Sequence, residues 1–183
     1  NYSERQVYIG THTRPPGNNP HVISEWMRKN GLVDEAQLPF TETFEEFIIP
    51  DPLPDDITSA GIAWKNKNDY GHEWVFTNIT PKSSRKALMM ECLQYSPLGV
   101  SVTPWFEEDG IYVDKGLPNT HWCVVYGFKD RGWKVFDSYD HSHKIYSFDS
   151  EISFCKRYYL GKSVPVADCC WLSKLFNLCP QKK

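Results

Sequence analysis

The sequence predicts an α+β fold, with a helical N-terminal half followed by a mostly antiparallel β-sheet. Apolar residues at helical spacing follow capping signals in the first half, and short β-branched or aromatic runs alternate with turns from Leu98 onward. The chain has 183 residues, of which 40% are hydrophobic and 15% aromatic. This content excludes an intrinsically disordered chain and suffices for one domain with a sizeable core.

The charge balance and the apolar runs exclude two classes of partner. Twenty basic and 23 acidic residues give a net charge of −3, so no basic field attracts nucleic acid. The mean hydropathy is −0.51, and no apolar run approaches the roughly 18 residues that cross a membrane. The sequence has no phosphate-cradling glycine loop and no structural zinc spacing, so we expect neither a cofactor nor a metal.

The first half contains two predicted helices. One begins at Asn19-Pro20, where Asn can cap the helix and Pro fits the first turn, and it ends before Gly31. The other begins at Thr80-Pro81 and ends near Tyr95. Their apolar faces consist of Val22, Ile23, Trp26 and Met27, and of Leu88, Met89, Cys92 and Leu93. We expect the second of these faces to lie in the core.

The second half contains six predicted strands, at residues 99–102, 110–113, 122–128, 133–136, 144–146 and 154–160. Turns at 107–109 and 129–132 separate neighbouring strands, and the apolar run at 122–128 is typical of a central strand. We therefore predict a single domain. Its helical lobe at 1–95 packs on an antiparallel β lobe at 96–162, and a C-terminal tail follows at 163–183.

The cysteines and the tail bear on the cellular setting. The six cysteines are Cys92, Cys123, Cys155, Cys169, Cys170 and Cys179, without a C-x-x-C pair. Because a chain of this length can build a core without disulfides, we expect reduced thiols in a soluble, cytoplasmic protein rather than a secreted one. Residues 167–183 have the spacing of a short amphipathic helix that packs on the domain or docks a partner.

A histidine and an aspartate occupy the far ends of a predicted hairpin. His121 opens one strand and Asp137 closes the next, 16 positions later. Opposed Cβ atoms in such a pair lie roughly 4.5–5.5 Å apart. The two residues share a face only if the loop has an odd number of residues or a strand carries a bulge. Gly132 favours a three-residue loop with a left-handed glycine, which brings His121 and Asp137 together.

Two roles are open to such a pair. If the side chains meet, Asp137 accepts one ring proton of His121 and fixes its tautomer, so the other ring nitrogen can act as a general base. A surface or structural hydrogen bond between neighbouring strands is the alternative.

The surrounding segment resembles the papain-like cysteine peptidases. In that superfamily the catalytic His begins an apolar strand that runs into a Val-Gly-Tyr-type sequence, and an orienting Asn follows at a similar spacing in an Asn-Ser-Trp motif. The corresponding parts here are His121, the sequence VVYGF at 124–128, and Asp137-Ser138-Tyr139. Asp thus replaces Asn, and Tyr replaces Trp. The resemblance implies catalytic roles for His121 and Asp137. It implies shielding or supporting roles for Tyr139, Ser138, Trp122 and Cys123.

Segments of the first half extend this resemblance. The sequence SERQV at 3–7 resembles the segment after the family's nucleophile helix, and WMRKNGLVDEAQLPF at 26–40 resembles its following helix and acidic turn. The sequence SPLGVSV at 96–102 is similar to the compact members from microbial and phage genomes, and this resemblance implies a phage-associated setting as the alternative to a cytoplasmic one. The resemblance covers residues 3–40 and 88–160 and implies a papain-like arrangement of the α+β fold.

The resemblance places the nucleophilic Cys and the oxyanion Gln upstream of Ser3-Glu4, and no cysteine of the chain has the matching motif. We therefore expect a cysteine peptidase that hydrolyses peptide or protein substrates by a Cys-His-Asp mechanism. The given chain alone lacks the nucleophile and is expected to be inactive. One alternative is a non-catalytic pseudo-peptidase that binds peptides or a partner. A cell-wall amidase or acyl transferase of related fold is the other.

Overall fold

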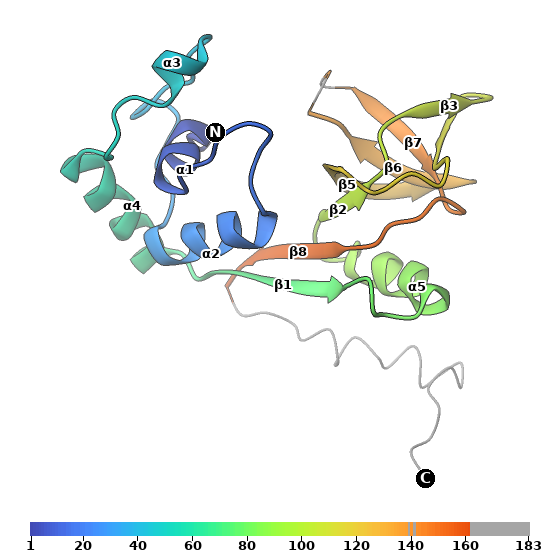
Figure 1. The fold of residues 1–183 in the computed structure, drawn as a ribbon. Coiled ribbons are helices and arrows are strands. Elements are labelled where there is room, and N and C mark those ends of the chain that lie inside the picture. The colour runs from blue at the N-terminus through green and yellow to red at the C-terminus, as the bar shows by residue number, and fades with distance from the viewer. Residues whose placement is uncertain (139, 141, 162–183) are drawn as a thin grey trace. The chain divides into compact units, whose positions relative to one another are not determined.

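Four helices precede the first strand in the computed structural model, which describes residues 1–138, 140 and 142–161 (Figure 1). The helices are α1 (Glu4–Gly10), α2 (Pro20–Asn30), α3 (Phe44–Phe47), α4 (Asp55–Lys67) and α5 (Lys82–Cys92). The strands are β1 (Tyr70–Phe76), β2 (Leu98–Val102), β3 (Phe106–Glu108), β4 (Ile111–Val113), β5 (His121–Lys129), β6 (Gly132–Phe136), β7 (His143–Ser147) and β8 (Cys155–Leu160). The tail predicted at 163–183, with Cys169, Cys170 and Cys179, lies outside the described residues, as does Tyr139.

The first of two structural units comprises residues Asn1–Gly71 together with Leu160 and Gly161. The predicted helix at 20–30 is confirmed: the Asn19 side chain accepts the backbone N–H of His21 at 2.8 Å, and Gly31 follows the last turn with φ 73°. An ideal Cβ at Gly31 would lie 1.9 Å from the carbonyl oxygen of Gly61 in α4, so only glycine fits there. The core of this unit consists of Ile9, Val33, Leu38 and Ile57.

The second unit runs from His72 to Tyr159 within the described residues and contains α5 and the open sheet, except for the first two residues of β1 and the last residue of β8. Its strand order is β1-β8-β2-β5-β6-β7-β4-β3 (Figure 1). Strand β4 pairs parallel with β7, whereas the pairs β8–β2, β2–β5, β5–β6, β6–β7 and β4–β3 are antiparallel. Helices together with this mostly antiparallel sheet confirm the α+β class. Met89 and Cys92 of α5 pack into a core of strand residues, as predicted for that helix face.

The predicted strands at 99–102, 110–113, 122–128, 133–136, 144–146 and 154–160 correspond to β2, β4, β5, β6, β7 and β8, with small differences at their ends. Two strands were not predicted. Strand β1 lies in the half predicted to be helix and loop, and β3 occupies part of the turn predicted at 107–109. The structural units also divide after Gly71, so α5 belongs with the sheet.

The start of α5 differs from the prediction of a Thr80 cap. Pro81 takes the capping position, and no side chain caps the helix. The Thr80 side-chain oxygen instead accepts the backbone N–H of Thr77 at 3.3 Å, and the Thr80 carbonyl accepts Nε–H of Arg85 at 2.9 Å. The helix then ends at Cys92 rather than near Tyr95.

A search of the described residues for membrane-spanning helices finds none with the necessary length and apolar character.

Candidate active site

The loop that joins β5 to β6 is a two-residue turn. Lys129 pairs with Gly132, so the turn consists of Asp130 and Arg131, and Asp130 has φ 42°. The predicted three-residue loop with a left-handed glycine is therefore wrong. Gly132 is instead the first residue of β6, where an ideal Cβ would lie 2.6 Å from the carbonyl oxygen of Tyr146. The glycine serves close strand packing rather than the turn.

A bulge in β5 places His121 and Asp137 on the same face of the hairpin, which the two-residue turn alone would not do. The register passes from Gly127 opposite Lys134 to Val125 opposite Val135, so Tyr126 is the additional residue. Since Val124 is opposite Phe136, continuing the ladder by one residue brings Asp137 level with Cys123. Cys123 and His121 share a face because they are two residues apart on a strand. Without the bulge, Asp137 would lie on the other face.

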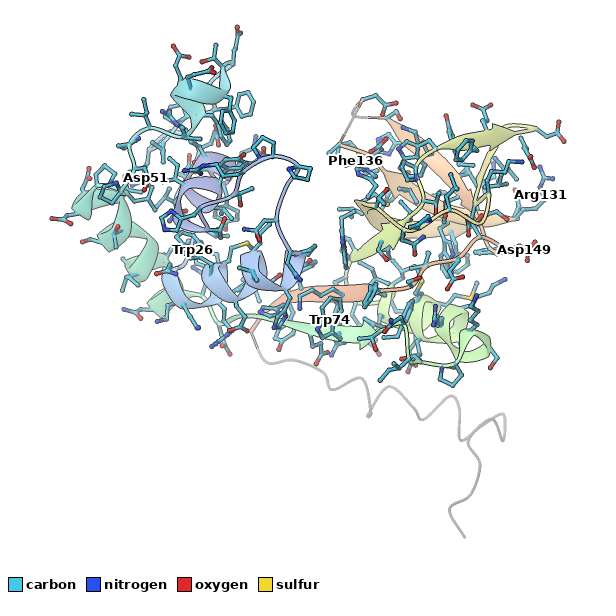
Figure 2. The ribbon with its side chains drawn as sticks, in the orientation of Figure 1. Trp26, Asp51, Trp74, Arg131, Phe136 and Asp149 are labelled. Atoms are coloured by element: carbon cyan, nitrogen blue, oxygen red, sulfur yellow. The ribbon has the colours of Figure 1, made fainter. Side chains whose placement is uncertain are left out.

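The structure brings His121 and Asp137 together at the end of the hairpin away from its turn. Figure 2 shows Phe136, the residue before Asp137, and Arg131 of the turn at opposite ends of β6. The Nε2 atom of His121 lies 2.8 Å from Oδ1 of Asp137. His121 is 6% exposed and Asp137 is fully buried. A carboxylate at Nε2 fixes the tautomer with the proton on that nitrogen and assigns acid–base chemistry to Nδ1.

Lys144 of β7 joins the pair through Asp137, and we call His121, Asp137 and Lys144 the triad. Its Nζ atom donates to Oδ2 of Asp137 at 2.7 Å and to both carboxylate oxygens of Asp140 at 2.8 Å. It also contacts the Ser142 hydroxyl at 2.5 Å. The Lys144 side chain is only 4% exposed, whereas that of Asp140 is 57% exposed. Asp137 therefore uses one oxygen for His121 and the other for a buried ammonium group.

The pKa values of the Lys144–Asp140 pair reflect these contacts. Burial lowers the pKa of Lys144, but the hydrogen bonds to Asp137 and Asp140 outweigh it and raise the pKa above its ordinary value. The hydrogen bond from Lys144, followed by that from Ser142, lowers the pKa of Asp140 to about 2. Near neutral pH, the site thus holds a charged ammonium group between two carboxylate side chains.

Aromatic rings cover the triad. The Trp105 ring lies 5.7 Å from the imidazole of His121 at an interplanar angle of 78°, and its centroid lies 5.0 Å from Nζ of Lys144. The Tyr112 ring lies 5.6 Å from the same ammonium group. Such ring faces favour a nearby cation. Nε1 of Trp105 is buried and has no hydrogen-bond partner among the described residues.

Three of the supporting residues implied by the family resemblance lie in the described part of the chain. Trp122 is on the opposite face of β5 from His121, because adjacent residues of a strand alternate, and its ring packs near Trp74 at 6.2 Å. The supporting role expected for Trp122 stays a prediction, and the ring that lies against His121 is that of Trp105. Ser138 is exposed. Cys123 is buried and lies on the same face of the sheet as His121 and Asp137.

The three cysteines in the described residues are poorly suited to act as nucleophiles. Cys92, Cys123 and Cys155 are all buried. Burial and the charge of Asp137 raise the pKa of the Cys123 thiol, and Lys144 offsets this only in part. Burial also raises the pKa of Cys155. Because the thiolate is the reactive form, these environments disfavour covalent catalysis by Cys123 or Cys155.

Lys144 and Trp105 are the site residues that the sequence analysis missed. Lys144 lies in a predicted strand two positions before Tyr146, which is fully buried, so alternation places both on the core-facing side. That pattern is a usable signal. Trp105 follows β2 in a segment without regular structure, and no local pattern points to it. In the described residues, no group of three or more His, Cys, Asp or Glu side chains is placed to hold a metal ion.

Comparisons with protein-family models and with curated proteins give no match to this sequence.

Proposed function

We propose that this chain carries the acid–base half of a papain-like cysteine peptidase that hydrolyses peptide bonds. The buried hydrogen bond between His121 and Asp137 carries the proposal, because it gives an imidazole one fixed tautomer and orientation. The motifs around the two residues support the family, since VVYGF at 124–128 and Asp137-Ser138-Tyr139 follow the order of the family's strand and orienting motif.

In the proposed reaction, Nδ1 of His121 takes the proton of a cysteine thiol, and the resulting thiolate attacks the peptide carbonyl. His121 then gives that proton to the leaving amine, which departs as the C–N bond breaks. Water, deprotonated by His121, hydrolyses the thioester and restores the thiol. Asp137 holds the imidazole throughout. Backbone N–H groups and the Gln that the resemblance implies stabilise the oxyanion.

The nucleophile of this proposal is not Cys92, Cys123 or Cys155, because all three are buried in the sheet unit. The family resemblance assigns the thiol to a cysteine upstream of Ser3-Glu4. The proposal therefore concerns the complete protein, and its tests use a protein that includes that segment.

The substitution His121→Ala in the complete protein tests the proposal. We expect kcat/KM for a fluorogenic peptide amide to fall about a thousandfold or more, since the general base is lost. Labelling by a thiol-reactive peptide probe should fall with it. His21→Ala, an exposed histidine of α2, is the matched control and should retain full turnover. Unchanged turnover in His121→Ala would refute the assignment.

A non-catalytic peptide-binding module is the second candidate, and one observation favours it. The side chains of His121, Asp137 and Lys144 form a buried, hydrogen-bonded network, and such networks also serve only to specify a fold. This candidate predicts that the complete protein binds peptides without cleaving them and that the thiol probe does not label it. Turnover of a cell-wall peptide amide or of an acyl-transfer acceptor, but not of ordinary peptides, would assign the related amidase or acyl-transferase chemistry instead.

A further inference from the structure

Asp137 is shared between two partners of different charge. Its Oδ1 faces Nε2 of His121 at 2.8 Å and its Oδ2 faces Nζ of Lys144 at 2.7 Å. The side chains of all three residues are at most 6% exposed, so water screens their charges little. A carboxylate beside an imidazole normally favours the imidazolium form, and a cation at the same carboxylate opposes that effect.

We propose that Lys144 is a positioning residue that orients the Asp137 carboxylate and cancels its charge, so that His121 faces a hydrogen-bond acceptor of net zero charge. The inference rests on the proposed function for its catalytic meaning, but its physical content concerns only His121, Asp137 and Lys144. It accounts for the departure from the family pattern at Asp137: a carboxylate paired with an ammonium group has the net charge of the neutral Asn that it replaces.

The other groups around the triad leave this balance intact. On the β7 side, the 57% exposed Asp140 also contacts Lys144, and its carboxylate is present in the wild type and in every variant that tests the balance between Asp137 and Lys144. From β4, Tyr112 faces Lys144, and partial burial with a hydrogen bond to Glu107 of β3 raises the pKa of its hydroxyl, which stays neutral. From β5, the Cys123 thiol beside Asp137 is neutral because burial raises its pKa. Trp105 contributes an uncharged ring.

Charge cancellation predicts opposite effects for the two single substitutions. Asp137→Asn keeps an acceptor oxygen for His121 but removes the negative charge beside it while Lys144 keeps its positive charge, so the imidazolium is disfavoured and the pKa of His121 falls. Lys144→Met leaves the carboxylate uncompensated, so the pKa of His121 rises. The combined Asp137→Asn and Lys144→Met variant restores neutrality and returns the pKa towards that of the wild type. At an effective dielectric constant of about 20–40, unit charges about 5 Å apart shift each other's pKa by about 1.2–2.4 pH units.

The experiment is an NMR titration of the His121 Cε1–H resonance in the wild type and the three variants. The His21 resonance in the same spectra is an internal control and should titrate identically throughout. Lys134→Met removes a lysine of β6 that strand alternation places on the face opposite Asp137, and it should leave the His121 titration unchanged. Lys144→Met leaves a buried carboxylate without its ammonium partner and can fail to fold; Asp137→Asn and the combined variant then carry the test, because Asp140 and Ser142 still hold Lys144 in the former.

A downward shift in Asp137→Asn that the combined variant reverses supports the proposal. If the pKa of His121 shifts in the same direction in both single variants, or in neither, the proposal is overturned. A purely structural role for Lys144 does not predict opposite shifts in the two variants. In the complete protein, the His121-controlled limb of the kcat/KM profile should move in the same directions. Absence of all turnover with the NMR pattern intact refutes the proposed function and leaves the charge cancellation standing.

Discussion

The substitution Gly132→Ala tests how closely β6 and β7 pack in the sheet that contains His121, Asp137 and Lys144. An ideal Cβ at Gly132 would lie 2.6 Å from Cγ2 of Ile145 and 2.6 Å from the carbonyl oxygen of Tyr146. The carbonyl oxygen belongs to the backbone of β7, so a methyl group at Gly132 requires the strand itself to shift. Gly132 also pairs with Lys129 of β5 and Ser147 of β7, and both ladders resist that shift.

The expected cost follows from these two contacts. Forcing a methyl group into a filled space costs about 1–3 kcal/mol, and exchanging a strand glycine for alanine returns about 0.5–1 kcal/mol. We therefore expect Gly132→Ala to lower the free energy of unfolding by about 1–2 kcal/mol. Gly127→Ala in the same hairpin is the matched control. Its Cβ would meet only Cδ of Lys134, at 3.7 Å, so the free energy of unfolding should stay level or rise by up to about 1 kcal/mol.

Urea unfolding followed by tryptophan fluorescence measures the free energy of unfolding of both variants, and Trp133, buried beside Gly132, is one of the seven tryptophans that contribute to the signal. Near-ultraviolet circular dichroism shows whether the aromatic packing of the folded state persists. If Gly132→Ala proves as stable as Gly127→Ala, β7 yields to the methyl group and the reasoning from backbone contact fails.

The lowered pKa of Asp140, about 2 in the folded protein against about 3.9 when unfolded, means that its ionised form stabilises the fold. That contribution is present above the unfolded pKa and is lost as the pH falls from about 4 towards 2, so the stability difference between wild type and Asp140→Asn should shrink over this range in urea titrations. A difference that stays constant from pH 5 to pH 2 would argue against the Lys144–Asp140 hydrogen bond. The buried thiols Cys92, Cys123 and Cys155 should resist iodoacetamide at pH 8 in the folded protein and react fully in urea, as measured by peptide mass mapping. Fast labelling of Cys123 in the folded state would show that the site is more open than the structure describes.

Local signals accounted for much of the fold, because their causes lie within a few residues. The capped start of α2 and its glycine stop follow directly from Asn19, Pro20 and Gly31. Thr80 carries the same kind of signal before α5, yet its side chain bonds to Thr77 instead. A capping residue therefore predicts the neighbourhood of a helix start more reliably than the atom that caps it.

The site was predictable only in its central pair. The positions of His121 and Asp137 at the ends of two neighbouring strands predict that the two side chains meet. The predicted cause, a loop with an odd number of residues, is wrong, because a bulge at Tyr126 places them on one face. A bulge depends on how two strands pair with each other and with the next strands of the sheet, so the sequence of one strand does not predict it. Lys144 and Trp105 reach the pair from β7 and from the segment after β2, and such meetings are set by the order of strands in the sheet.

The bulge at Tyr126 also determines which insertions and deletions this hairpin tolerates. Lengthening both strands by one residue moves the turn outward and leaves His121 and Asp137 on their common face. Adding a single residue to one strand reverses the face of one partner unless a second irregularity compensates for it. Natural or engineered variants that keep the pair should therefore differ in its spacing by even numbers, and a spacing that differs by one identifies a hairpin whose bulge has been gained or lost.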